Sequence, residues 1–258
     1  MQVQSVEQIL ERIGEAARAH PGGVVAFDGD GTLWSGDVGE DFFHGLVAHG
    51  DIREPARAKI DREAADHGLT TGGSGKELAA RIYADYLAGR YPEEAVCELM
   101  TWAFADWTHG EVDAFAAQTV VRGGVEGRLH PEVKRVVAWA KAQGIEVFLV
   151  SASPVAIIEH AGKVAGIDAD HVVAALPRYE AGRMVPDVHR PIPYGPGKVK
   201  NLRARIGSSR PLYAAFGDNA FDIAMLSEAF IPVAVRPKPR LRERAGEVQK
   251  LVEIARES

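Results

Sequence analysis

Residues 24–33 read Val24-Val25-Ala26-Phe27-Asp28-Gly29-Asp30-Gly31-Thr32-Leu33. The first four residues form a short, continuous apolar run, and polar and glycine residues follow it at once. Such a run, bounded by turn-forming residues, is typical of a strand that is buried on both faces of a parallel sheet. The stretch therefore predicts a buried strand over 24–27 that ends in a loop carrying two carboxylates.

The same pattern returns further along the chain. Apolar runs occupy 145–150, 212–216 and 231–235; Ser151-Ala152-Ser153 follows the first, and Gly217-Asp218-Asn219 follows the second. Segments of helical pattern lie between or beside them, at 131–143, 154–165, 199–206 and 220–229. Strands that alternate with helices predict an α/β fold with a doubly wound, mostly parallel, Rossmann-like sheet. Ligands of such sheets bind at the carboxyl ends of the strands.

One long segment breaks this alternation. From Asp37 to Gly127 the pattern is nearly all helical, with little strand signal. We therefore expect an α/β core domain formed by 1–36 and 128–258, and a helical domain formed by 37–127 that lies over the strand ends. We also expect an opening helix over 5–19, and a small hairpin within 172–188 that turns at Ala181-Gly182.

Composition excludes several classes of protein. The 258 residues are 46% hydrophobic and 26% charged, which is ordinary for a globular protein. The net charge of -6 argues against a nucleic-acid partner, although a local site can still be positive. No apolar run approaches the roughly 20 residues that span a bilayer, and the first residues lack a signal-peptide pattern, so we expect a cytoplasmic protein without a membrane partner. The single cysteine, Cys97, is expected to be a small buried apolar residue, and the oligomeric state is left open.

The loop after the first strand has the residue types of a phosphoryl-transfer site. Asp28 and Asp30, two residues apart just past a buried strand, can converge on one point. Glycines beside them let the backbone approach an anion closely. Mg²⁺ favours one or two carboxylates together with phosphate oxygens and waters, so a metal-assisted phosphoryl site is one interpretation. The alternative is a turn of aspartate and glycine residues with no ligand.

Residues of three later segments allow similar pairs of interpretations. Ser151 either donates its hydroxyl to a phosphate or caps the helix that starts near Pro154. Asp218 and Asp222 either add carboxylates to the same site or cap a helix. Lys198 follows Gly195-Pro196-Gly197 and either reaches a phosphate or is solvated, with Lys200 as its rival.

These segments together resemble the motifs of the haloacid dehalogenase superfamily. Asp28-x-Asp30-Gly31-Thr32, Ser151, Lys198 and Gly217-Asp218-x-x-x-Asp222 occur in the order of its four motifs, and they span residues 24–222. The helical insert after the first motif resembles the cap of the phosphoserine-phosphatase-like branch, and Val150-Ser151-Ala152-Ser153-Pro154 is similar to the second motif of that branch.

The resemblance implies a role for each matching residue. Asp28 is the nucleophile that forms an aspartyl-phosphate, and Asp30 is the general acid and then the base. An acid at Asp30 favours phosphate esters over carbon–halogen bonds, because a halide leaves without a proton. Gly29, Ser151, Ala152 and Lys198 bind the phosphate; Asp28, Asp218 and the backbone carbonyl of Asp30 hold Mg²⁺; Asn219 and Asp222 orient those groups from behind.

We therefore expect a Mg²⁺-dependent phosphatase of a small phosphomonoester, with phosphoserine or another amino-alcohol phosphate as the candidates. The alternative is a non-catalytic protein that binds a phosphorylated ligand or Mg²⁺ on the same fold; a receiver-like phosphoacceptor would have no use for Asp30 or for the insert. Substrate contacts are expected from Trp34, Asp37, Glu40 and Asp41, although these acids also suit the start of a helix. Trp102, Trp107 and His109 lie in the insert, where tryptophans either form a core or cage a cation.

Overall fold

The computed structural model describes residues 1–257, and in them a parallel sheet of seven strands forms the centre of the molecule, in the order β1-β9-β8-β7-β2-β3-β4. Every pairing in this sheet is parallel. The strands are β1 (Gln2–Gln4), β2 (Val24–Phe27), β3 (Glu146–Pro154), β4 (Val172–Ala175), β7 (Leu212–Gly217), β8 (Ile231–Ala234) and β9 (Val252–Ile254). The predicted fold class is confirmed, and β2 lies near the middle of the sheet, as its buried sequence requires.

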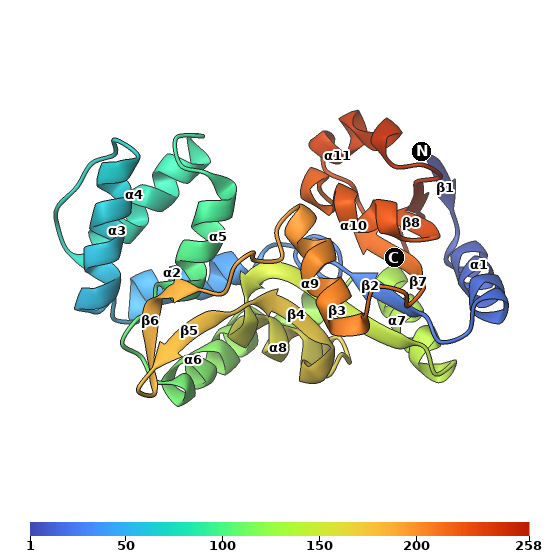
Figure 1. The fold of residues 1–258 in the computed structure, drawn as a ribbon, viewed down its shortest axis with the longest axis horizontal. Helices are drawn as coiled ribbons and strands as arrows, with labels where there is room; N and C mark the ends of the chain where they lie inside the picture. Colours follow the sequence, from blue (N-terminus) through green and yellow to red (C-terminus); the bar gives the residue numbers. More distant parts are fainter. Residues whose placement is uncertain (258) are drawn as a thin grey trace.

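Helices cover both faces of the sheet (Figure 1). They are α1 (Val6–Ala19), α7 (Pro131–Ala142), α8 (Val155–Val164), α9 (Pro196–Ile206), α10 (Ile223–Glu228) and α11 (Pro239–Glu243). Alternate residues of β2 point to opposite faces: Val25 and Phe27 join the core under α1, α7 and α8, whereas Val24 and Ala26 join the core under α9, α10 and α11. This alternation explains why a continuous apolar run is needed for the strand.

A group of helices interrupts the core between β2 and α7. They are α2 (Val38–His49), α3 (Glu54–Asp66), α4 (Gly75–Leu87), α5 (Glu93–Trp102) and α6 (His109–Arg122). In Figure 1, α3, α4 and α5 stand beside the sheet, whereas α2 and α6 run along α8. The hairpin β5 (Pro177–Glu180) and β6 (Arg183–Val188) joins this group, because Met184 donates its N–H to the Trp107 carbonyl at 2.9 Å.

The structure corrects several details of the sequence prediction. Strands β1 and β9 pair with each other at the sheet edge and were not predicted, because segments this short, such as Gln2-Val3-Gln4, carry no buried apolar run. The predicted helix over 220–229 is divided into a 3₁₀ turn, Ala220–Asp222, and α10. The hairpin turn at Ala181-Gly182 and the opening helix are found where they were predicted, the helix capped by Ser5. None of the helices within residues 1–257 is long and apolar enough to cross a membrane.

Candidate active site

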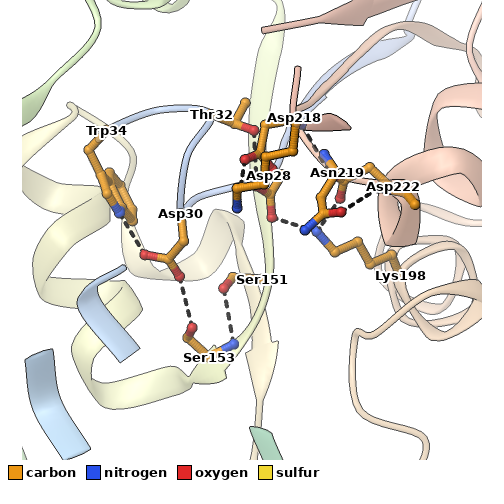
Figure 2. A network of polar contacts seen from close by, with 12 residues as sticks. Asp28, Asp30, Thr32, Trp34, Ser151, Ser153, Lys198, Asp218, Asn219 and Asp222 are labelled. Atoms are coloured by element: carbon orange, nitrogen blue, oxygen red, sulfur yellow. Dashed lines mark hydrogen bonds and ion pairs between the residues drawn. The ribbon is translucent and has the colours of Figure 1, made fainter. Parts of the chain in front are cut away.

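Asp28 and Asp218 lie side by side because their strands are neighbours in the sheet. Register pairing sets Phe27 opposite Phe216, and Asp28 donates its N–H to the Phe216 carbonyl at 2.9 Å. Each aspartate is the first residue after its strand, and both side chains are buried. Figure 2 shows the two carboxylates at one edge of the sheet. Of the two interpretations of the first motif, a bare turn does not account for this convergence.

Lys198 occupies the space between the carboxylates of Asp28 and Asp222. Its Nζ lies 2.5 Å from Asp28 Oδ1 and 2.5 Å from Asp222 Oδ1, and its side chain is fully buried (Figure 2). Burial alone would lower the pKa of Lys198, but the Asp222 and Asp28 carboxylates outweigh burial and raise it. Lys200, the rival in the sequence, is exposed. The ammonium group of Lys198 is therefore charged and held against the predicted nucleophile.

The loop before Lys198 depends on one glycine. A Cβ at Gly197 would lie 2.0 Å from the Ile192 carbonyl oxygen, so a larger residue would displace the start of α9. The sequence Gly195-Pro196-Gly197 thus fixes where the lysine enters the core.

Asp222 orients the neighbouring residues. Its Oδ2 accepts the backbone N–H groups of Asp218 at 3.0 Å and of Asn219 at 2.9 Å, while its Oδ1 accepts from Lys198. Asn219 caps the 3₁₀ turn after β7, since its Oδ1 accepts the N–H of Ala220 at 2.7 Å. Both aspartate oxygens are thus occupied by donors.

The side chains of Asp28, Asp218 and Asp222 form a buried acidic cluster. One oxygen from each lies within 4.8 Å of the others. Asp218 Oδ1 is buried with no hydrogen-bond partner among residues 1–257, and Asp218 Oδ2 pairs with Lys238 Nζ at 2.9 Å. Burial and the Asp222 charge raise the pKa of Asp218 to about 6. Buried carboxylates with an unpaired oxygen are what a hard divalent cation needs as ligands, so this cluster fits such an ion.

Gly31 is required beside this cluster. It adopts a φ of 84°, and a Cβ there would lie 2.1 Å from Asp218 Oδ2. Both the left-handed backbone and the contact with a carboxylate oxygen exclude a side chain at this position.

Asp30 points away from the acidic cluster. Its Oδ1 accepts from Trp34 Nε1 at 2.8 Å and from the Val38 N–H at 2.7 Å, and its Oδ2 accepts from Ser153 Oγ at 2.8 Å (Figure 2). Burial raises the pKa of Asp30, although these three donors oppose the rise. The predicted metal contact of Asp30 is made by its backbone carbonyl. The direction of the Asp30 side chain does not test that prediction.

The phosphate-binding prediction involves Ser151, Ala152 and Gly29. Ser151 is part of β3 and lines the cavity with Ala152, and its Oγ accepts the N–H of Ser153 at 3.1 Å. Pro154, not Ser151, is the residue before α8, so the helix-cap interpretation of Ser151 is wrong. Gly29 is buried against the Trp34 ring and forms the turn by accepting the Leu33 N–H at 2.8 Å; it does not line the cavity.

A cavity of about 360 Å³ joins these groups to the helical insert. Acidic, aromatic, apolar and small polar residues line it. They are Asp28, Asp30, Gly31, Gly36, Asp37, Glu40, Tyr86, Glu93, Val96, Cys97, Met100, Ser151, Ala152, Ser153, Tyr194, Asn219, Phe221 and Lys238. Lys198 lies beneath it, fully buried. Cys97 is half-buried on its wall, and burial raises the pKa of its thiol.

Several residues that were expected to contact substrate form hydrogen bonds or ion pairs within the protein. Trp34 is fully buried and donates to Asp30, so it is not a wall of the cavity. Asp41 pairs with Arg128 at 2.5 Å. Asp37 caps α2 by accepting the Glu40 N–H at 2.8 Å, yet both acids also line the cavity. Asp37 therefore caps the helix as one interpretation predicts, and its expected contact with substrate stays a prediction.

The aromatic residues of the insert belong mostly to its core. Trp102 is fully buried and Trp107 nearly so, with its Nε1 donating to the Asp51 carbonyl at 2.9 Å. His109 faces a separate cavity of about 280 Å³ beside α6. Neither tryptophan lines the active-site cavity, so they do not cage a cation there.

Several cavity residues were not predicted from the sequence, among them Lys238, Ser153 and the side chains Tyr86, Glu93, Tyr194 and Phe221. Lys238 follows β8, the strand next to β7, in the segment Arg236-Pro237-Lys238-Pro239. A basic residue just past a predicted strand was the available signal. In the sequence Ser153 is one of several polar residues that follow an apolar run, and its contact with Asp30 depends on how β3 continues past Ser151.

Comparisons with known proteins agree with this geometry. The family model of haloacid dehalogenase-like hydrolases matches residues 25–227. The chain is 32% identical over 140 residues to a phosphoserine phosphatase of Polaromonas sp. (strain JS666 / ATCC BAA-500), a match that covers 50% of this chain and 59% of that protein, less than two thirds of its length.

Solved structures with low identity share the fold. A protein of unknown function from Bordetella pertussis Tohama I matches with a TM-score of 0.67 and 23% identity, covering 89% of this chain and 97% of the other. A phospho-aspartyl intermediate analogue of phosphoserine phosphatase matches with a TM-score of 0.51 and 16% identity, covering 91% of this chain and 94% of the other. At these identities the likeness concerns the fold. The family match extends from the strand before Asp28 past Asp222, and the chain belongs to the haloacid dehalogenase-like hydrolases.

Proposed function

We propose that this protein is a Mg²⁺-dependent phosphatase that hydrolyses a small phosphomonoester through an aspartyl-phosphate on Asp28. The observation that carries the proposal is the arrangement around Asp28. Its carboxylate contacts a buried Lys198, lies in the acidic cluster with Asp218, and shares a cavity with the separately held carboxyl group of Asp30. A protein that only binds a ligand would not need a second acid held apart in this way.

The first step transfers the phosphoryl group to the protein. Asp28 forms a bond to phosphorus while the bond from phosphorus to the ester oxygen breaks, and Asp30 gives its proton to that oxygen. Lys198 offsets charge on the phosphoryl oxygens, and the Ser151 hydroxyl, Ala152 and the Gly29 backbone are the proposed further contacts. In the second step a water oxygen bonds to phosphorus while the bond from phosphorus to Asp28 breaks, and Asp30 takes a proton from that water. Inorganic phosphate is released, and free Asp28 and protonated Asp30 are restored.

The acidic cluster would hold the metal. We assign the Asp28 and Asp218 side chains and the Asp30 carbonyl as ligands, with Asp222 and Asn219 orienting them. When bound, Mg²⁺ offsets the repulsion between an anionic nucleophile and an anionic ester.

The helical insert would act as a cap over the strand ends, with 37–127 as its extent and 1–36 and 128–258 as the core. The cavity lies between the two, which favours a small substrate over a nucleic acid or protein. Phosphoserine or another amino-alcohol phosphate is the substrate class that we propose, supported by the acidic residues of the cavity and by the named relative.

A phosphate-release assay tests this proposal. Phosphoserine, amino-alcohol phosphates, glycerol 3-phosphate and p-nitrophenyl phosphate are incubated with the protein, with and without Mg²⁺. We expect metal-dependent release that Asp28→Asn abolishes. Binding of phosphate and Mg²⁺ without turnover of any ester would favour the non-catalytic alternative.

A further inference from the structure

The lining of the active-site cavity contains two chemically different groups of side chains. The aspartates and serines of the strand ends form the first group. The second group, here called the distal wall, consists of six side chains from α2 and the residue before it, from α4 and α5, and from the segments before α9 and after β7: Asp37, Glu40, Tyr86, Glu93, Tyr194 and Phe221. A substrate whose phosphate lies at the first group shares the cavity with this wall, so its alcohol part meets these side chains.

Glu40 and Glu93 give the distal wall its negative charge, whereas burial and the Asp30 charge raise the pKa of Asp37 well above its ordinary value. Asp37 and Glu40 form no ion pair with any residue between 1 and 257, and Glu93 has only Arg240 at 3.6 Å, a side chain that is 76% exposed and outside the cavity lining. The lining contains no arginine, and its one lysine, Lys238, is paired with Asp218. The alcohol part of the substrate therefore meets carboxylates without a free cation beside them.

Aromatic rings complete this wall. Tyr194 and Phe221 lie with ring centroids 5.4 Å apart, and Tyr86 faces the same cavity. Burial, with the nearby Glu93 carboxylate, raises the pKa of Tyr86 to about 12, so its hydroxyl is neutral at pH 7. Phe221 already has the Lys198 ammonium 5.1 Å from its ring centroid. Aromatic faces together with carboxylates are the surroundings that stabilise an ammonium group.

We infer that the substrate is the phosphate ester of a small alcohol that carries an ammonium group, primary or quaternary, and no carboxylate. This inference rests on the proposed function and narrows it. The ammonium group would lie against Glu40, Glu93 and the rings, while the phosphate lies at Asp28. Phosphoserine has the same amine but adds a carboxylate, which would face like charges with no arginine in the lining to receive it.

The cavity also limits the size of the alcohol. At about 360 Å³ it is near the lower end of the roughly 300–1,000 Å³ of small-molecule sites. A phosphate joined to a short ammonium chain fits this volume, whereas a long-chain lipid does not.

The experiment compares kcat/KM for four esters at one Mg²⁺ concentration: phosphoethanolamine, phosphocholine, phosphoserine and glycerol 3-phosphate. We expect one of the two ammonium esters without a carboxylate to exceed both phosphoserine and glycerol 3-phosphate at least tenfold. The order between the two reports whether the wall prefers a primary or a quaternary ammonium. Preference for phosphoserine or glycerol 3-phosphate would overturn the inference and leave the phosphatase proposal intact. No hydrolysis of any ester, p-nitrophenyl phosphate included, would overturn both.

Variants of the wall provide the second arm. Glu40→Gln and Glu93→Gln should each reduce the kcat/KM ratio of the preferred ammonium ester to phosphoserine at least fivefold. Glu94→Gln is the matched control, because Glu94 is the neighbour of Glu93 on α5 but is exposed and outside the cavity lining. A ratio of two substrates cancels any loss of folded protein. Unchanged ratios in both wall variants would overturn the assignment.

Discussion

Replacing Asp222 by asparagine tests the buried charge arrangement without removing volume. Asp222 uses both oxygens: one accepts from Lys198, and the other accepts two backbone N–H groups. In Asp222→Asn an NH₂ group must take one of these places and would face donors in either orientation. The substitution therefore breaks one half of this arrangement whichever way the amide turns.

The expected loss of stability follows from burial. Removing one partner of a buried ion pair costs about 3–5 kcal/mol. Lys198 keeps Asp28 as a partner at 2.5 Å, and the loss of the Asp222 charge relieves its repulsion with Asp28 and Asp218. We therefore expect the lower end, a fall of about 3 kcal/mol in the free energy of unfolding. For a chain of this size that lowers Tm by roughly 6–12 °C.

Denaturant unfolding and thermal melts in EDTA measure this difference without a contribution from bound metal. Glu228→Gln is the matched control, since Glu228 pairs with Arg203 at 3.0 Å but its side chain is 42% exposed. An exposed pair contributes roughly 0–1 kcal/mol, so the control should stay near the parent protein. If Asp222→Asn loses no more stability than Glu228→Gln, the buried lysine does not depend on Asp222 and this reasoning is wrong.

Three further outcomes are expected. Asp28→Asn should abolish turnover, whereas Asp30→Asn should slow it by about 10²–10⁴-fold and let the phosphorylated protein accumulate, as intact-mass measurement after rapid quenching would show; normal turnover by Asp28→Asn would contradict the mechanism. The pKa of Asp218 is raised to about 6 from 3.8, so the metal-free folded state holds an extra proton between these pH values and its stability should fall as pH rises through that window. The rise in Tm on adding Mg²⁺ should therefore be larger at pH 7.5 than at pH 5. A rise in Tm that is independent of pH, or that is retained in Asp218→Asn, would contradict this. Gly31→Ala, whose Cβ would lie 2.1 Å from Asp218 Oδ2, should reduce activity at least tenfold and remove the Mg²⁺-dependent rise in Tm, which thermal melts can check.

The buried strands and the order of the site residues could be predicted because they depend on local pattern. An apolar run that ends in aspartate, glycine or serine marks both a central strand and its carboxyl end, so this pattern predicts that Asp28, Ser151 and Asp218 lie close together. Parallel neighbours bring such ends to the same edge. The prediction needed no knowledge of side-chain direction.

Contacts that depend on side-chain direction could not be predicted. Trp34 was expected to face a substrate, but its indole is fully buried and donates to Asp30. Lys238 reaches Asp218 from a segment that follows β8, and only the strand order brings these residues together. The edge strands β1 and β9 are too short for a periodic pattern. These features are set by tertiary packing and not by sequence spacing.

The two acids of the first motif are close in sequence but lie in different electrostatic surroundings. Burial and the Asp222 carboxylate raise the pKa of Asp28 well above its ordinary value, and the buried ammonium group of Lys198, which contacts Asp28, opposes this rise. Asp30 contacts only neutral donors, among them the N–H of Val38, the first residue of α2. The first residue of the insert's first helix therefore donates a hydrogen bond to the proposed general acid. Any movement of α2 changes one hydrogen bond to Asp30 and none to Asp28, so the position of the insert would bear on proton transfer while leaving the nucleophile unchanged.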